Sequence, residues 1–185
     1  GAALAAETWE PLGLCAGGST YSLATSPVDP NVMMISSDMS EAFVSEDGGK
    51  AWRMIHYSQL LSCTSCSPVF DPKVRGRAIA PAGRNNDLRV TTDCGRTWQT
   101  WCKEDLWKKD RLTALFIDPD QPARVLVGTS AGAFVTDDDG KTIQPCGGVA
   151  GKVLGFAVDR ASPAARRVCF AGTDAGVFRS EDGGR

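Results

Sequence analysis

Two polar loops carry the side chains best suited to bind a ligand. The loop from Gly83 to Asp87 is rich in hydrogen-bonding groups, namely Arg84, Asn85 and Asp87. The loop from Lys103 to Asp110 places Trp107 among carboxylates and lysines. An exposed indole beside charged groups suits a sugar, whose C–H face stacks on the ring while its hydroxyls form hydrogen bonds. We therefore expect a glycan-binding surface here; the alternative for Trp107 is packing inside a short helical turn.

Metal and cofactor chemistry finds little support in the sequence. Cys63-Thr-Ser-Cys66 is a lone CxxC with no second pair, and the chain has one histidine, His56. Asp137-Asp-Asp-Gly140 fails as an EF-hand loop, because its sixth and twelfth positions are Thr142 and Gly148. No metal or cofactor is expected. Seven cysteines leave at least one unpaired within the chain, and disulfides stay open if the protein is exported.

Charge and hydropathy exclude two classes of partner. The net charge is −2, with lysines and arginines spread along the chain, which argues against a nucleic-acid surface. No apolar run approaches the roughly 18 residues of a membrane span. The start, Gly1-Ala-Ala-Leu-Ala-Ala6, contains an A-x-A sequence typical of the end of a signal peptide. An extracellular or periplasmic protein is expected.

A repeat organises these loops. The pattern S/T-x-D-x-G-K/R-x-W starts at Ser45, Thr91, Thr136 and Ser180, spaced 46, 45 and 44 residues apart. It is the Asp-box, or BNR repeat. Upstream of each box lie an Asp turn and short apolar runs, which predict four strands per repeat in an antiparallel meander. The predicted fold is all-β: a β-propeller of four-stranded blades.

The whole chain, residues 1–185, is predicted to be one propeller region. Its four blades are expected at residues 21–56, 64–102, 112–146 and 153–185, the last completed by a strand at residues 8–14 or by residues outside the sequence. Two architectures follow: a four-bladed ring closed on itself, or part of a ring of about six to eight blades. The second is favoured, with further blades from the same or another chain.

The recurring positions of the box have a mechanical explanation. The aspartate accepts hydrogen bonds from turn amides, the glycine adopts positive φ, and the tryptophan packs between sheets. We assign structural roles to Asp47, Gly49, Trp52, Asp93, Gly95, Trp98, Asp138, Gly140, Asp182 and Gly184.

Strand direction predicts which loops share a face. The boxes and the Asp-Pro turns lie at one end of the blades, and the second-to-third strand loops and interblade connections lie at the other. Glu41, in the first of those loops, and Tyr57, after the fourth strand of the first blade, are therefore added to the predicted binding surface. His56 is interpreted as a rim residue.

The boxes resemble those of sialidases, sortilin-type receptors, photosystem II assembly factors and xyloglucan-cleaving endoglucanases built of two seven-bladed propellers. The segment from Gly17 to Phe43 most resembles the opening of those endoglucanases, with its Pro27-Val-Asp-Pro-Asn-Val32 turn. The sialidase interpretation is weakened because no Arg-Ile-Pro segment is present.

The resemblance to the endoglucanases implies that Asp38 is a catalytic carboxylate acting as general base. In that family the acid partner comes from the second propeller, which this sequence does not contain. Local substitutes would be Glu41, Asp87, Glu104 and Asp105. This chain has Ser40-Glu41 where the family has Gly-Gly, which makes the loop bulkier. The predicted function is a carbohydrate-directed, glycoside-hydrolase-like propeller; the alternative is a non-catalytic module that binds a protein partner.

Overall fold

Four antiparallel sheets follow one another along the chain in the computed structural model, which describes residues 8–14, 18–39, 41–61, 65–83, 87–102, 107 and 109–185. We name the sheets blades 1 to 4. Blade 1 contains β1 (Thr20–Thr25), β2 (Met33–Ser37), β3 (Ala42–Ser45) and β4 (Arg53–Met54). Blade 2 contains β5 (Val69–Phe70), β6 (Ala78–Ala82), β7 (Asp87–Thr91) and β8 (Gln99–Thr100).

Blade 3 contains β9 (Leu112–Ile117), β10 (Val125–Thr129), β11 (Ala133–Thr136) and β12 (Gln144–Pro145). Blade 4 contains β13 (Val153–Asp159), β14 (Val168–Thr173) and β15 (Gly176–Ser180), with a short 3-10 helix, η1 (Ala164–Arg166), between its first two strands. Every strand pairs with its neighbour in sequence, so each blade is the predicted meander. Blade 4 has three strands in the described part of the chain, and β15 is its edge.

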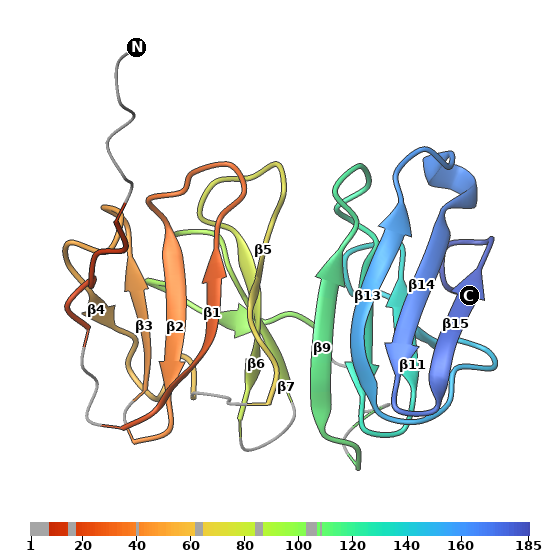
Figure 1. The fold of residues 1–185 in the computed structure, drawn as a ribbon, viewed down its shortest axis with the longest axis horizontal. Helices are drawn as coiled ribbons and strands as arrows, with labels where there is room; N and C mark the ends of the chain where they lie inside the picture. The colour runs from red at the N-terminus through yellow and green to blue at the C-terminus, as the bar shows by residue number, and fades with distance from the viewer. Residues whose placement is uncertain are drawn as a thin grey trace.

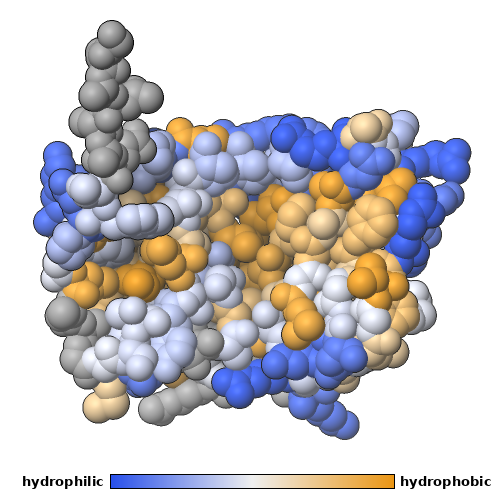
Figure 2. All heavy atoms as spheres, in the orientation of Figure 1, coloured by the Kyte–Doolittle hydropathy of each residue, from blue (hydrophilic) through white to orange (hydrophobic). Residues whose placement is uncertain are grey.

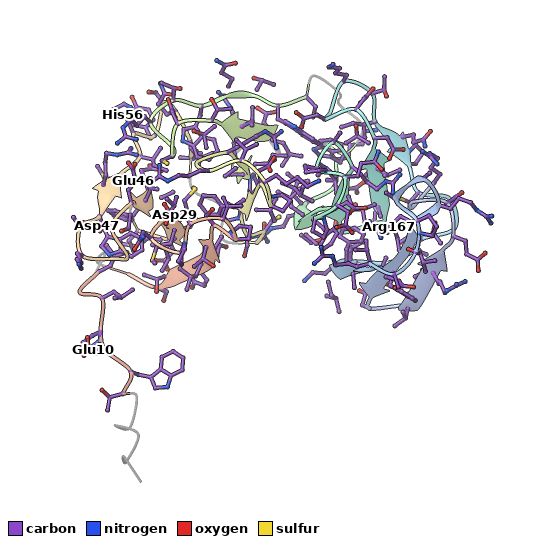
Figure 3. All side chains as sticks on the ribbon, turned by 90° about the horizontal axis from the view of Figure 1, so that it is seen from above. Glu10, Asp29, Glu46, Asp47, His56 and Arg167 are labelled. Carbon is purple, nitrogen blue, oxygen red and sulfur yellow. The ribbon has the colours of Figure 1, made fainter. Side chains whose placement is uncertain are left out.

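The blades form an arc. The first strands contact each other in series, β1 with β5, β5 with β9, and β9 with β13. Seen from above, blades 1 and 4 lie at the two ends of the arc (Figure 3), and Figure 1 shows the first strands β1, β5, β9 and β13 standing roughly upright in the view. How deeply a strand is buried depends on its place in this arc. Strands β6 and β10, in the middle blades, are buried along their whole length, whereas β15 has no fully buried residue.

The four turns that precede the fourth-strand positions, here called the repeat turns, have the same hydrogen bonds. The hydroxyls of Ser45, Thr91 and Thr136 each donate to the aspartate two residues on, at 2.8–2.9 Å. The same hydroxyls, and that of Ser180, accept the N–H of the glycine four residues on, at 2.8–3.0 Å. These glycines have φ between 73° and 95°, so a side chain there would strain the turn.

Each junction between blades contains one residue that follows a fourth strand, here called the junction residue. Ile55 and Trp101 donate their N–H groups to Ala42 O and Leu88 O of their own blades. Their side chains lie over a glycine in the repeat turn of the next blade. A Cβ at Gly140 would lie 2.8 Å from the Trp101 ring, and one at Gly95 would lie 3.5 Å from Ile55. The equivalent residue after β12 is Cys146, whose N–H binds Ala133 O.

Arginines tie neighbouring blades together at the repeat-turn end. Arg167, 1% exposed, donates Nε to Asp118 of blade 3 at 3.0 Å and Nη2 to Asp120 at 2.6 Å. Arg77 of blade 2 likewise binds Asp139 in the repeat turn of blade 3, at 2.5 Å. The arginines precede the second strands, which places their guanidinium groups where adjacent turns meet.

Residues 8–14 make no strand in this structure. They lie against blade 1, where the Leu12 side chain would be 2.7 Å from a Cβ at Gly49. Trp9 is fully exposed, at 102%. The edge of β15, with which a strand here was expected to pair, lies at the other end of the arc (Figure 3).

Candidate functional site

Main-chain hydrogen bonds confirm which loops share a face. At one end, the repeat turns bind the first-to-second strand turns, as in Gly48 N to Asn31 O at 3.0 Å and Asp139 N to Ala123 O at 2.9 Å. At the other end, each second-to-third turn binds the segment that leads into the first strand of the same blade. The four bonds are Asp38 N to Ser19 O, Gly83 N to Leu61 O, Ser130 N to Arg111 O and Asp174 N to Lys152 O, at 2.8–3.2 Å.

A hollow of about 480 Å³ opens on this second face, between blades 1 and 2. It is lined by Glu41, Tyr57, Ser58, Gln59, Leu61, Ala82, Asp87 and Arg89. Three of the residues predicted for substrate binding, Glu41, Tyr57 and Asp87, thus come together from separate loops. Arg84 and Asn85 lie outside the described residues.

The rim of the hollow is an aromatic pair held by side-chain bonds. Tyr57 is 64% exposed, and its ring centroid lies 4.5 Å from that of His56 at an interplanar angle of 37°. His56 Nδ1 and Ser58 Oγ are 2.7 Å apart. The Gln59 side chain accepts the N–H of Trp98 at 2.9 Å, which ties the segment to blade 2. The Tyr57 ring is therefore presented on a braced turn.

Polar groups of both signs line the same hollow. Glu41 and Asp87 supply carboxylates, and Arg89 supplies a cation. The Nε of Arg89 is buried and has no hydrogen-bond partner in the described part of the chain. A buried donor without a partner costs free energy, and its burial keeps this Nε out of reach of a ligand in the hollow, which meets the guanidinium charge instead.

Asp38 occupies a position that recurs in the other blades. In blade 4, Asp174 Oδ1 accepts the N–H of Lys152 at 2.8 Å; in blade 3, Ser130 Oγ accepts the N–H of Arg111 at 3.1 Å. The Asp38 side chain is exposed and lies beside Gly18, where a Cβ would be 2.3 Å from its Oδ1. Asp38 does not line the hollow between blades 1 and 2.

Trp107 does not provide the exposed stacking surface that the sequence suggested. Its side chain is 1% exposed and packs edge-on against Phe134 of blade 3, with ring centroids 5.5 Å apart at 63°. The physical reason is the apolar junction between blades 2 and 3, which also buries Trp101 and Leu112. Glu104 and Asp105, in the same loop, lie outside the described residues.

A second hollow, of about 280 Å³, was not predicted from the sequence. It lies between blades 3 and 4 and is mainly apolar, with Leu126, Cys146, Phe156, Cys169 and Phe178 among its lining residues. Burial raises the pKa of Cys146 to about 12 and that of Cys169 to about 11. The sequence does contain a signal for this hollow: Cys146 is a small residue at the junction position that the larger Ile55 and Trp101 fill between the other blades.

Of the described cysteines, Cys94, Cys146 and Cys169 are free thiols. Within the described ranges, no group of three or more His, Cys, Asp or Glu side chains is placed to hold a metal ion. None of the described helical segments has the length and apolar character to cross a bilayer.

The sheets, their arc and their repeat turns define a β-propeller fold. No protein-family model and no curated sequence matches the chain. Several solved structures match the chain. An ancestral GH74 enzyme matches with a TM-score of 0.74 at 18% identity, over 97% of this chain and 25% of that one. The GH74 xyloglucanase from Xanthomonas campestris matches with 0.63 at 19% identity, over 91% of this chain and 30% of that one.

The GH74 enzyme of Niastella koreensis gives a TM-score of 0.65 at 13% identity, over 86% of this chain and 30% of that one. This chain therefore spans about a quarter to a third of the length of these enzymes. The computationally designed Ika4 protein matches with 0.61 at 13% identity, over 91% of this chain and 94% of that one.

Proposed function

We propose that this chain is a carbohydrate-directed propeller that binds a polysaccharide in the hollow between blades 1 and 2. The observation that carries the proposal is the convergence of Tyr57, Glu41 and Asp87 on one hollow at the loop face. An exposed aromatic ring supplies a stacking platform, and carboxylates with Arg89 supply hydrogen bonds for sugar hydroxyls. The likeness in fold to GH74 enzymes supports this class of ligand.

The finer assignments belong to the same proposal. The repeat turns are Asp-boxes, the chain is exported, and it forms part of a propeller with further blades. Asp38, which lies on the same loop face outside the hollow, acts as general base on a part of the polysaccharide that extends beyond the hollow. Its acid partner lies outside the described site or in another part of the assembly, at the separation of roughly 6.5 to 9.5 Å that leaves room for the attacking water.

Binding is tested by calorimetry with xyloglucan oligosaccharides. Tyr57→Ala should weaken binding by about tenfold, because the stacking platform is lost. Tyr21→Ala is the matched control, since Tyr21 is the other tyrosine of the chain, is 39% exposed and does not line the hollow. Equal affinities for the native chain and Tyr57→Ala would place the binding site elsewhere.

Hydrolysis is tested separately, by release of reducing ends from xyloglucan. Asp38→Asn should abolish turnover while binding and the free energy of unfolding change little. Turnover that survives this substitution would remove Asp38 from the mechanism.

A non-catalytic module is the second candidate, and one observation favours it. Asp38, Ser130 and Asp174 occupy equivalent turn positions, and the latter two cap a main-chain N–H. An aspartate at this position therefore has a structural use that needs no reaction. Glycan binding without turnover by the native chain would favour this candidate.

A further inference from the structure

The aromatic rim of the hollow between blades 1 and 2 lies at a polar end of the blades. Figure 2 shows mostly polar side chains along both ends of the blades and apolar side chains between them. Tyr57 is exposed at the loop face and lines the hollow. His56, the one histidine of the chain, follows β4 on the outer side of the arc (Figure 3). The described lining of the hollow includes Tyr57 but not His56, so an effect of His56 on a ligand there passes through its neighbours.

The main chain turns tightly at this rim. The N–H groups of Gln59 and Leu60 both donate to His56 O, at 2.8 and 3.2 Å. The Gln59 side chain accepts the Trp98 N–H at 2.9 Å, which fixes the end of the turn to blade 2. Tyr57 lies within this turn, directly after its first residue. The direction of its ring therefore depends on the bonds that close the turn around it.

The imidazole of His56 supplies one of those bonds. Its Nδ1 accepts the main-chain N–H of Ser58 at 3.3 Å and lies 2.7 Å from Ser58 Oγ. Side chains of Asn and Asp stabilise turns in the same way, by accepting the N–H two residues on. An N–H that donates to Nδ1 needs the lone pair of that nitrogen, so this bond exists only while Nδ1 carries no proton. The bond spans Tyr57 and constrains the backbone from which its ring projects.

Protonation of the imidazole removes this bond. The imidazolium carries a hydrogen on each ring nitrogen, so Nδ1 can still donate to Ser58 Oγ but can no longer accept the Ser58 N–H. Histidine ordinarily gains this proton between about pH 8 and 5. The charged groups that the described residues place around the hollow are Glu41 of blade 1 and Asp87 and Arg89 of blade 2. A substitution at His56 leaves these three in place, so their own titration can be measured separately.

We propose that His56 is a positioning residue for Tyr57 and thereby makes glycan binding in the hollow depend on pH. The inference rests on the proposed function of this hollow. With neutral His56, the turn holds the Tyr57 ring in the orientation that meets the ligand, and binding pays no entropy to order it. With the imidazolium, the Ser58 N–H loses its acceptor and the ring loses that orientation. Affinity falls as the pH is lowered from about 7.5 to 5.5.

Calorimetry with xyloglucan oligosaccharides at the two pH values tests the proposal. The native chain should bind about fivefold more weakly at the lower pH, the ratio that one hydrogen bond is worth. His56→Ala lacks the acceptor and should bind weakly at both pH values. His56→Asn should bind at both as tightly as the native chain does at the higher pH, because its amide oxygen can accept the Ser58 N–H and does not titrate.

The asparagine variant also separates the acceptor from the ring. Both variants lack the imidazole that contacts Tyr57, so weak binding by His56→Asn as well as His56→Ala would overturn the proposal. A pH dependence that persists in His56→Asn would overturn it too, because the titrating group would then be Glu41 or Asp87. An equal affinity of the native chain at the two pH values would have the same consequence.

Nuclear magnetic resonance tests the positioning without a ligand. The Ser58 amide and the Tyr57 ring should shift with pH together with the His56 ring, and the Ser58 amide should stay constant in His56→Asn. Tyr21, the other tyrosine, is the internal control and should not follow His56. A Ser58 amide that does not follow the His56 ring would overturn the inference whether or not a glycan binds. The expected shifts in a chain that binds no xyloglucan would confirm the positioning of Tyr57 and overturn the carbohydrate function.

Discussion

The aspartates of the repeat turns are held as carboxylates by the turn itself. Hydrogen bonds from the Thr142 hydroxyl and N–H, and from Thr136, lower the pKa of Asp138 to about 2. Burial alone would raise the pKa of Asp93, but bonds from Thr97, Thr91 and Arg96 outweigh it and lower that pKa to about 2 as well. Both values lie below the ordinary value of 3.8, so the ionised forms stabilise the fold.

These lowered pKa values determine how the free energy of unfolding changes with pH. A carboxylate with a depressed folded-state pKa contributes its full stabilisation above about pH 4 and loses it as the pH falls toward 2. The difference in free energy of unfolding between the native chain and Asp138→Asn should therefore be constant from about pH 6 to 8 and shrink between about pH 4 and 2. Urea titrations at these pH values measure it. A difference of the same size in strong acid and at neutral pH would contradict this role for Asp138.

Trp101 is the largest of the described junction residues. It is 8% exposed, lies over Gly140 and donates Nε1 to Asp139 at 2.9 Å. Trp101→Ala should destabilise the protein by about 3–5 kcal/mol, because a buried indole leaves a cavity and an unpaired partner. Urea denaturation measures the loss. The half-buried Trp52 offers a comparison, since Trp52→Ala should cost less; equal losses would mean that the glycine contact adds nothing.

At the scale of elements, buried ion pairs hold the turns of neighbouring blades in register. Arg167 joins the start of β14 to Asp118, which follows β9 and is fully buried. Arg167→Ala should cost about 3–5 kcal/mol, because the Asp118 charge stays buried after losing a partner.

Arg160→Ala is the matched control for that ion pair. Arg160 is 68% exposed and binds Asp120 at 2.9 Å, so solvent screens the pair and its loss should change the free energy of unfolding little. Thermal or urea unfolding of both variants makes the comparison. Similar small losses in both would show that Arg124, 3.7 Å from Asp118, suffices to neutralise it.

The strands and the loop faces could be predicted because short segments within each repeat determine them. The spacing of Ser45, Thr91, Thr136 and Ser180 fixes one turn per blade, and strand direction then assigns every other loop to a face. Contacts between blades were harder to predict, because they join residues far apart in the sequence. Arg77 and Asp139, for example, are 62 residues apart. Trp107 shows the consequence: its loop is polar in sequence, yet its side chain completes a junction with Phe134 of the next blade.

At the scale of the whole molecule, the junction between blades 3 and 4 should be the least reactive place for a thiol. Because burial raises the pKa values of Cys146 and Cys169 to about 12 and 11, few thiolates exist at about pH 8. Alkylation of both by iodoacetamide should be slower than in urea by at least about 100-fold, since the thiolate is the nucleophile. Mass spectrometry of peptides resolves each site. Rates equal to those in urea would mean that this junction opens freely.

The differing junction residues also bear on how a chain of similar repeats folds correctly. Blades built on one pattern can dock in the wrong order, a characteristic failure of repeat proteins. Isoleucine, tryptophan and cysteine occupy this position at residues 55, 101 and 146, and so give each of these junctions its own volume. A blade docked out of sequence would press an indole into a space shaped for a smaller side chain, or leave a void. We therefore expect these three side chains to favour the docking of each blade against its own neighbour in the chain.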